Sequence, residues 1–379
     1  MAKRSIQPKK ISKSPRELGY TFPAEWEKQS GTWMSWPRPE GISFPGRYRH
    51  IGVQLCAIVR EIAARQRVHI NVPNENWEDI VTEELKSNGV AMKRVQFHHI
   101  KTNESWCRDH GPAFLRKCGG RSAESGGKKP LASVLRTPDS ALAIVDWTFN
   151  AWGGKYPPYD DDDAVPGQVA AALKIETVFK PGIVMEGGAV DFNGAGTVLT
   201  TTDCLLNKNR NPKLKKPAIE RYLKDFYGQS HVCWLTGGIA GDDTDGHIDD
   251  LARFISPTKI VFGIESNRDD ENYTVSKDVR RQLDDLRDQD GNSFEIVELP
   301  MPKPVVIEDQ RCPATYMNFL FVNGAILVPV FGDRKNDARA LSVLKEHLPK
   351  HDVVGVRCDE IIWGLGAIHC LTQQVPTDA

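Results

Sequence analysis

The chain has 379 residues, of which 40% are hydrophobic and 26% charged, a composition that excludes wholesale disorder. Its 49 Lys and Arg residues balance 50 Asp and Glu residues, and the resulting net charge of −1 argues against nucleic acid or another polyanion as partner. No apolar run approaches the roughly 20 residues that a membrane span needs. The eight cysteines are scattered without a CxxC pair, so neither a zinc ribbon nor a disulfide framework is indicated.

The N-terminal segment is basic and polar. Its first 16 residues include six Lys or Arg residues and no acidic residue, and no apolar segment typical of a secretory signal follows. We therefore expect a disordered basic tail over residues 1–18 and, because the cysteines look free, a cytoplasmic protein. A Gly-, Ser- and Lys-rich segment at 117–131 is predicted to be a surface insertion.

Helical and extended patterns alternate along the rest of the chain. Apolar residues at spacings of three and four predict a helix over about 48–66, followed by a strand over 67–72 and a helix over 76–87. Further strands are predicted at 143–147, 197–202, 259–264, 294–299, 325–330 and 353–356. Further helices are predicted at 167–174, 217–227, 275–286 and 335–347. This order predicts an α/β fold, and no linker divides it.

Five clusters of unusual residues that contain glycine recur at intervals of about 60 to 80 positions, with one gap of about twice that length. They are GTWMSWP at 31–37, WCRDHGP at 106–112, MEGG at 185–188, TDGHID at 244–249 and GLGAIHC at 364–370. If the chain is a ring of similar α/β modules, all five clusters would face one central site.

Two of the clusters contain residues suited to nucleophilic and acid/base chemistry. Cys370 lies in a Gly-rich turn, where a thiol can meet a substrate, although a buried structural role is the commoner fate of a free cysteine. His247 and Asp249 would share one face of an extended segment and form an acid/base pair. A structural histidine or a divalent-metal site remains the alternative.

Two other clusters contain carboxylates suited to a cation. Asp109 follows Trp106 closely, and a flat apolar wall beside a fixed anion suits a planar guanidinium. The alternative is a loop aspartate paired with Arg108. Glu186 follows an apolar run, and we expect it to pair with a histidine or a cation, unless it caps a strand.

Weaker signals remain open. Trp33, Trp36 and Trp152 are candidates for the wall of a pocket, although tryptophans are more often part of a core. The run Asp160–Asp163 is typical of a solvated loop, with a calcium site as the alternative. No P-loop, dinucleotide-binding glycine motif or GxSxG is present, so nucleotide binding and serine hydrolysis lack support.

From about residue 23 to residue 376, the chain resembles the agmatine deiminase / Porphyromonas-type peptidylarginine deiminase family of guanidino-group-modifying enzymes. The resemblance rests on eight motifs in order: GTWMSWP (31–37), WCRDHGPAF (106–114), FNAWGG (149–154), MEGG (185–188), GTVLTTTDCLLNKNRNP (196–212), TDGHIDD (244–250), YMNFLFVNGAILVPVFGD (316–333) and IHCLTQQVP (368–376). It implies one domain over residues 19–379, a pentein α/β propeller of five ββαβ-type modules around a pseudo-fivefold axis.

The resemblance also implies roles for residues. Cys370 matches the nucleophile, His247 the general acid/base and Glu186 the carboxylate that orients the histidine, while Asp109 and Asp249 match the two carboxylates that bind the guanidinium. The further residues expected to contact substrate are Trp106, Asp243, Trp33, Trp152 and Gly366. In the implied reaction a thiolate attacks the guanidinium carbon, ammonia leaves, and water hydrolyses a covalent S-alkylthiouronium. No metal or organic cofactor is required.

The substrate expected from the resemblance is agmatine, which would give N-carbamoylputrescine for putrescine biosynthesis. The alternatives are a peptidyl, C-terminal or free arginine giving citrulline, an amidinotransferase, a metallohydrolase that uses His247, Asp249 and His369, and a propeller that only binds. The sequence leaves a homo-oligomer open.

Three departures from the family pattern bear on the substrate. Leu365 and Ala367 replace two residues of the usual GGGNIHC, and Asp243 stands where a glutamate usually faces the amine of agmatine. Arg38, Pro39 and Glu40 follow the WP motif in place of the usual ERPDNW run.

Overall fold

A computed structural model describes residues 13–117 and 141–378. Most of the predicted tail and insertion, 1–12 and 118–131, lies outside these ranges. The tail prediction is wrong for its end, because Arg16–Leu18 form a 3-10 helix (η1) that leads into a short strand, β1 (Tyr20–Thr21). Lys117 is the last residue of a strand rather than the start of an insertion. No helix in the described ranges is both long and apolar enough to cross a membrane.

Four successive modules share one connectivity, in which an antiparallel strand pair is followed by a helix and a parallel strand. The modules are β5 (Ala113–Lys117), β6 (Leu142–Val145), α6 (Val165–Leu173) and β7 (Val178–Phe179); β8 (Val190–Phe192), β9 (Thr197–Thr201), α8 (Lys216–Tyr227) and β10 (His231–Leu235); β11 (Ala252–Ser256), β12 (Lys259–Ile264), α10 (Asn272–Asp285) and β13 (Glu295–Pro300); and β16 (Leu320–Val322), β17 (Ala325–Val330), α11 (Arg334–His347) and β18 (Asp352–Arg357).

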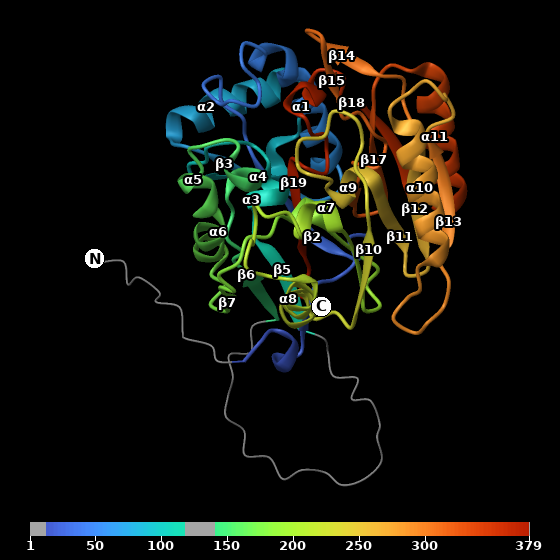
Figure 1. The fold of residues 1–379 in the computed structure, drawn as a ribbon. Helices are drawn as coiled ribbons and strands as arrows, with labels where there is room; N and C mark the ends of the chain where they lie inside the picture. Colours follow the sequence, from blue (N-terminus) through green and yellow to red (C-terminus); the bar gives the residue numbers. More distant parts are fainter. Residues whose placement is uncertain (1–12, 118–140, 379) are drawn as a thin grey trace.

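The remaining module, which we call the first module, joins the two ends of the chain. Its first strand is β19 (Thr372–Pro376), which pairs antiparallel with β2 (Gln29–Ser35). It continues with α1 (Tyr48–Ala63), β3 (Arg67–Val72), α2 (Glu75–Ser87) and β4 (Val95–His99), and its last two strands run parallel to β2. Blue and red strands therefore share a sheet (Figure 1). The predicted propeller of five ββαβ-type modules is confirmed.

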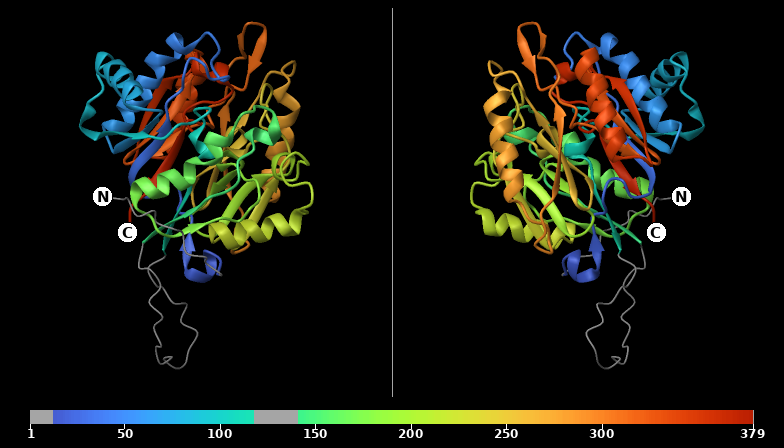
Figure 2. Two further views of the ribbon diagram at one scale, coloured as in Figure 1. Left: turned by 90° about the vertical axis from the view of Figure 1, so that its left-hand side faces the viewer. Right: turned by 90° about the vertical axis from the view of Figure 1, so that its right-hand side faces the viewer.

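Burial explains why these segments form modules. The first two strands of each module are buried over most of their length, as in Thr197–Thr201, whereas the last strands, such as Asp352–Arg357, are more exposed, so the inner strands of each sheet need cover on both faces. Helix α8 covers its sheet with Ile219, Leu223 and Tyr227, which recur every fourth residue and are all buried. The helices lie toward the outside of the sheets in the two side views (Figure 2). The opposite ends of the sheets are thus left to meet near the middle.

Shorter elements connect the strands and modules. They are η2 (Met92–Arg94), α3 (Cys107–His110), α4 (Ala151–Gly154), α5 (Asp160–Asp163), η3 (Gly187–Ala189), α7 (Thr202–Leu205), α9 (Ile248–Leu251), the hairpin β14 (Val305–Ile307) and β15 (Gln310–Cys312), and η4 (Ile361–Gly364). Three of them, α3, η3 and α9, directly precede the first strand of a module. Helices α3, α7 and α9 lie near the middle of the molecule, close to β19 (Figure 1).

Candidate active site

The side chains suited to catalysis or binding come from one topological position that recurs in all five modules. This position is the turn just before the first strand of each module, and it contributes Asp109 (α3), Glu186 (before η3), Asp249 (α9), Asn318 (before β16) and Cys370 (before β19). Each turn is short, so its side chain is fixed relative to the strand that follows. Because the first strands of the modules surround the axis, residues far apart in the sequence converge there.

Cys370 is 4% exposed and has two polar neighbours at its sulfur. The amide Nδ2 of Asn318 lies 3.0 Å from Sγ, and Oδ2 of Asp249 lies 3.7 Å away. Burial raises the pKa of the Cys370 thiol well above its usual value, and the charges of Asp249 and Asp250 add to the rise. The thiol is therefore protonated in the empty site, and a bound cation would favour the thiolate.

His247 is completely buried and is held by Glu186, with Nε2 3.1 Å from Oε2. Arg210 donates to both oxygens of that carboxylate, from Nε at 2.8 Å and from Nη2 at 3.2 Å. Burial opposes ionisation, but His247 and Arg210 lower the pKa of Glu186 to about 2. Burial alone would lower the pKa of His247, because it disfavours the charged ring. The charge of Asp109 and the hydrogen bond to Glu186 instead raise this pKa well above its usual value. The charged imidazolium is thus favoured.

Asp109 and Asp249 present oxygens to the same small space. Oδ2 of Asp109 accepts from the indole of Trp152 at 2.9 Å, and Oδ1 accepts from the Gly188 N–H at 2.9 Å. Burial raises the pKa of the Asp109 carboxyl and Asp249 adds to the rise, while His247 opposes it. Among the described residues, Asp249 Oδ1 and His247 Nδ1 have no hydrogen-bond partner although both are buried. Polar atoms left unpaired in this way indicate a place for a ligand.

Gly188 marks the centre of that space. A Cβ at this residue would lie 2.5 Å from Nδ1 of His247, 2.9 Å from Oδ1 of Asp109 and 3.1 Å from Oδ1 of Asp249. Three polar atoms therefore surround the point that a side chain at Gly188 would fill. Glycine is required here because the atoms approach the backbone closely, and its φ is not in the left-handed region.

A cavity of about 240 Å³ adjoins this centre through Asp109, whereas Gly188, His247 and Asp249 lie behind its lining. It contains Cys370 and Asp109, and four aromatic side chains line it: Trp106, Trp152, Tyr156 and Trp363. No lysine or arginine lines it in the part of the chain that the structure describes. An acidic, aromatic cavity without a cation of its own suits a cationic ligand.

The predicted substrate contacts fall into two groups. Trp106, Trp152, Asp243 and Gly366 line the cavity, whereas Trp33 does not, so that part of the prediction is wrong. Trp33 is fully buried in the first module, where its indole donates to Asn71 at 2.8 Å and its ring stacks against His69 and His98, which also contact each other. Its large apolar surface serves the core. Trp36 is also buried, outside the cavity lining.

Two local predictions near the site are wrong. His247 and Asp249 are not in an extended segment, because His247 caps α9 and Asp249 lies within that helix. They still approach each other, with Nδ1 3.9 Å from Oδ1. Glu186 does not end a strand, since Val184 forms only an isolated bridge with Thr148 before η3 begins.

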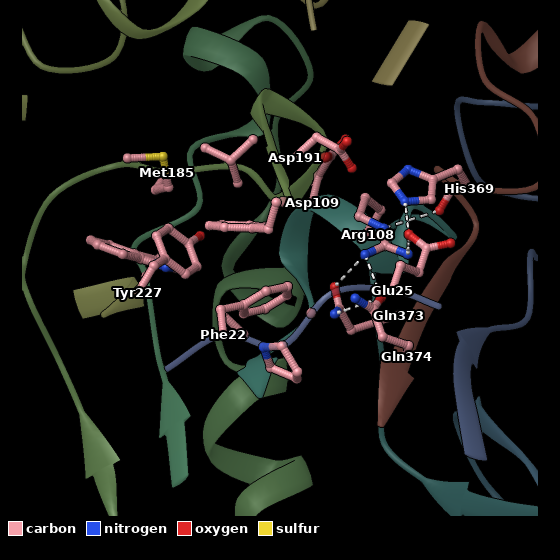
Figure 3. Close-up of a pocket in the computed structure, with 17 residues that line it drawn as sticks. Phe22, Glu25, Arg108, Asp109, Met185, Asp191, Tyr227, His369, Gln373 and Gln374 are labelled. Carbon is pink, nitrogen blue, oxygen red and sulfur yellow. Dashed lines mark hydrogen bonds and ion pairs between the residues drawn. The ribbon is translucent and has the colours of Figure 1, made fainter. Parts of the chain in front are cut away.

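Arg108 points away from Asp109, so the ion pair considered for these neighbours does not form. The Arg108 guanidinium donates to Gln374 at 2.7 Å and lies in a second, narrow cavity of about 20 Å³, enough for about one water (Figure 3). Asp109 and Arg108 occupy one turn of α3. Asp109 lines both cavities, whereas Arg108 lines only the narrow one.

Asn318 is a site residue that the sequence prediction missed. Its Oδ1 accepts from the backbone N–H groups of Ala367, His369 and Cys370 at 3.0–3.2 Å, and its Nδ2 donates to Asp250 as well as to the sulfur. An uncharged amide carries no strong signal, although it lies in the YMNFLF motif. Only the recurrence of one site residue per module could have indicated it.

The acidic run Asp160–Asp163 is a helix (α5) rather than a solvated loop, and it does not form an evident calcium site. Asp162 is 1% exposed and accepts from the backbone N–H groups of Asn103 and Glu104. Its role is to hold the segment that precedes the WCRDHGP motif.

Two clusters in the described part of the chain have the spacing of metal ligands: Glu186, Cys204 and His247, and Asp249, Asp250 and Cys370. In the first cluster, the Arg210 guanidinium already contacts Glu186 and would oppose a second cation. The set considered for a metallohydrolase does not form, because both ring nitrogens of His369 are bonded to carboxylates, Asp249 and Glu25.

The family profile of Porphyromonas-type peptidyl-arginine deiminase matches residues 21–376. The chain belongs to this family. Among its relatives, the agmatine deiminase of Ectopseudomonas mendocina (strain ymp) is 33% identical over 389 residues, which cover 97% of this chain and 98% of the relative. The agmatine deiminase of Medicago truncatula is 32% identical over 391 residues, with 97% and 99% covered.

Solved structures agree with this membership. The agmatine deiminase of Enterococcus faecalis superposes with a TM-score of 0.85 at 29% identity, covering 98% of this chain and all of the other. A Cys-to-Ser variant of the C. jejuni agmatine deiminase with substrate bound superposes with a TM-score of 0.81 at 32% identity, covering 94% and 96%. The resemblance in sequence and the five-module fold of this deiminase family member are therefore confirmed.

Proposed function

We propose that this deiminase family member hydrolyses the guanidino group of agmatine to N-carbamoylputrescine and ammonia. The observation that carries the proposal is the convergence of a buried histidine and two carboxylates on one point beside Gly188, with the sulfur of Cys370 3.7 Å from one of these carboxylates. The relatives called agmatine deiminases, which match almost the whole chain at 32–33% identity, support the same substrate. The chain would thus be a hydrolase of C–N bonds in linear amidines.

Binding comes first in the proposed reaction. The guanidinium enters the acidic cavity and donates N–H groups to Asp109 and to the free Oδ1 of Asp249. Its plane lies between aromatic walls, which attract cations. A guanidinium is resonance-stabilised and a poor electrophile, so holding its carbon beside Cys370 is a large part of catalysis.

The arriving cation also activates the nucleophile. In the empty site the nearby carboxylates keep the Cys370 thiol protonated, and the bound guanidinium offsets their charge. The thiol releases its proton to solvent, and the thiolate, to which the Asn318 amide donates, forms a bond to the guanidinium carbon. His247, as the imidazolium, transfers a proton to the departing nitrogen. The C–N bond breaks, ammonia leaves and an S-alkylthiouronium remains on Cys370.

Hydrolysis of this intermediate uses the same histidine as a base. Neutral His247 accepts a proton from water, the oxygen attacks the thiouronium carbon, and the C–S bond breaks. Glu186 keeps the ring oriented in both steps through Nε2, which leaves Nδ1 facing the site. The ureido group of the product is neutral and no longer pairs with the two carboxylates, so the product leaves.

The cavity favours agmatine over free arginine. Asp243 lines it and is bonded to the Tyr156 hydroxyl, which places a negative charge where the amine of agmatine would lie. The carboxylate of arginine would instead meet Asp243 without a lysine or arginine in the lining to pair with. Putrescine biosynthesis, a cytoplasmic location and a homo-oligomer remain predictions that accompany this proposal.

The test is to incubate the purified protein with agmatine, free arginine and peptides with internal or C-terminal arginine, and to measure ammonia and ureido product. Agmatine is expected to give the highest kcat/KM, and Cys370→Ser to abolish turnover while binding persists. Activity is expected to be unchanged by a chelator. Full activity of Cys370→Ser would remove the mechanism, and preference for an arginine substrate would remove agmatine.

A further inference from the structure

His369 precedes the candidate nucleophile and lies between two buried carboxylates. Its Nδ1 is 2.7 Å from Oδ2 of Asp249, and its Nε2 is 2.8 Å from Oε2 of Glu25. The ring is 2% exposed and does not line the substrate cavity. Figure 3 shows the ring with Glu25 and Arg108 at the side of the narrow second cavity. His369 therefore touches the guanidinium-binding carboxylate from behind.

The bond between His369 and Asp249 determines which oxygen of Asp249 is free. Because Oδ2 is bonded to His369, the carboxylate cannot rotate without breaking a short bond in a buried place. Oδ1 then remains unpaired and lies 3.9 Å from Nδ1 of His247, on the side of Gly188. The bond to Nδ1 thus aims one oxygen of Asp249 at the guanidinium position.

Glu25 anchors the other side of the ring. Its Oε2 accepts from Nη2 of Arg253 at 2.7 Å, and its Oε1 accepts from the Phe321 N–H at 2.7 Å. Arg253 in turn is bound to Asp191 at 2.8 Å and is completely buried. The chain of contacts connects the N-terminal segment with β8, β11 and β16. His369 is consequently fixed by a charged network from three modules rather than by its own loop alone.

We propose that His369 is a positioning residue for the substrate, which orients Asp249 toward the guanidinium by bridging it to Glu25. This inference rests on the proposed function and names a determinant of binding within it. It separates the two histidines of the site by role: His247 exchanges protons with the reacting groups, and His369 does not touch them. A carboxylate accepts hydrogen bonds only, so the bridge requires donors at both ring nitrogens.

The experiment compares His369→Leu with His369→Asn, both in the Cys370→Ser background, by titration calorimetry with agmatine. Leucine removes both donors, and we expect the Kd to rise on the order of 10- to 100-fold, as for the loss of a hydrogen bond to a charged group. The asparagine amide can still donate near the position of Nδ1, so we expect its Kd to remain within about threefold. His69→Leu is the matched control: His69 is 4% exposed, is bonded to His98 and does not line the cavity.

A second variant protects the test from a folding defect, since the loss of one partner in a buried charged network is strongly destabilising. Glu25→Gln retains the shape of the side chain but removes its charge. With Cys370 intact, we expect the acidic limb of kcat/KM to move to higher pH, because the His369 ring, whose hydrogen bond lowers the pKa of Asp249, loses the carboxylate that holds its other nitrogen. The charged groups that face the bridge, besides Asp249 and Glu25 themselves, are Arg108, Arg253, His247 and Asp250. A purely structural residue would change the thermal midpoint without moving this limb.

The outcomes separate the two proposals. Equal agmatine affinity in the folded His369→Leu and parent proteins, with an unmoved acidic limb in Glu25→Gln, overturns the positioning role and leaves the deiminase proposal intact. A wild-type protein that neither binds nor turns over agmatine removes the proposed function and the positioning role together. A rise in Kd confined to His369→Leu supports both.

Discussion

Individual side chains in this site are defined by the bonds they already have. Both oxygens of Asp109 accept hydrogen bonds from the protein, whereas Oδ2 of Asp249 does so and Oδ1 does not. The unpaired Oδ1 lies on the side of Gly188. Together with His247, these oxygens surround a point beside Gly188 that suits a planar cation. Burial of several carboxylates so close together is unfavourable without a cation, which is a physical reason for substrate binding.

Substitution of Gly188 by alanine tests whether the point beside this residue is the guanidinium site. The added methyl would lie 2.5 Å from Nδ1 of His247 and occupy the space between the carboxylates, while the backbone conformation suits alanine. We expect kcat/KM for agmatine to fall at least about 100-fold, since misplacement of a substrate by about 1 Å has that effect. Gly167→Ala is the control, because its nearest neighbour is 3.9 Å away. Unchanged kinetics in a folded Gly188→Ala protein would place the substrate elsewhere.

Asn318→Asp tests the contact between the amide and the sulfur. Aspartate keeps the acceptor for the backbone N–H groups of the nucleophile turn but replaces the donor to Cys370 by a second acceptor. A negative charge beside the sulfur disfavours the thiolate, so we expect kcat to fall on the order of 100-fold with a smaller change in KM. The rate of alkylation of Cys370 by iodoacetamide is expected to fall in parallel. An unchanged alkylation rate would contradict this role.

The lengths of the helices and strands explain which segments can be predicted from the sequence. The long amphipathic helices begin and end within about three residues of their predicted positions, as for Lys216–Tyr227, because one apolar face recurs over three turns. The first strands of the modules were missed: Val190–Phe192 and Leu320–Val322 have three residues each, too few for periodicity. The strand Gln29–Ser35 contains Gly31 and was interpreted only as a motif. These short strands are nonetheless the ones that carry the site.

The first module should be sensitive to acid through two histidines on β3 and β4. Burial, aided by His98 and Arg67, lowers the pKa of His69 to about 3, and burial with His99 lowers that of His98 to about 4, both from about 6.5. The unfolded chain therefore takes up protons first, and stability is complete above about pH 6.5 and lost as the pH falls toward 4. We expect the thermal midpoint to decrease over this window. The double variant His69→Gln and His98→Gln is expected to show a weaker dependence; an identical one would contradict the assignment.

The ring as a whole depends on closure by its last strand. Strand β19 pairs with β2 over five residue pairs and follows the Cys370 turn directly, so one short segment both completes the first module and holds the nucleophile. The charge balance of 49 basic and 50 acidic residues conceals the local consequence of closure. Acidic residues from separate modules gather at the axis, and their basic partners, such as Arg253 and Arg210, surround them from outside the substrate cavity.

Deletion of residues 372–379 tests this dependence. It leaves Cys370 in place but removes β19 together with its buried residues, such as Val375, and so exposes the edge of β2. We expect loss of the cooperative thermal transition and of activity, measured by differential scanning calorimetry and by ammonia release. Replacement of Thr377 and Asp378 by alanine, outside the strand, is the control and should change neither. Retention of a cooperative transition after the deletion would show that the ring closes without β19.

The amino-acid sequence by itself determined the chemistry that is available and the alternation of elements, because residue types and apolar periodicity are local properties. The cysteine, the histidine and the carboxylates could be recognised by their motifs. Only the tertiary structure decided which of them meet: Glu25 and His369 are 344 positions apart, and Asn318 is 52 positions from Cys370. It also removed Trp33 from the cavity and turned Arg108 away from Asp109. Closure of five modules around one axis brings these side chains together, and no local pattern reports the geometry of that closure.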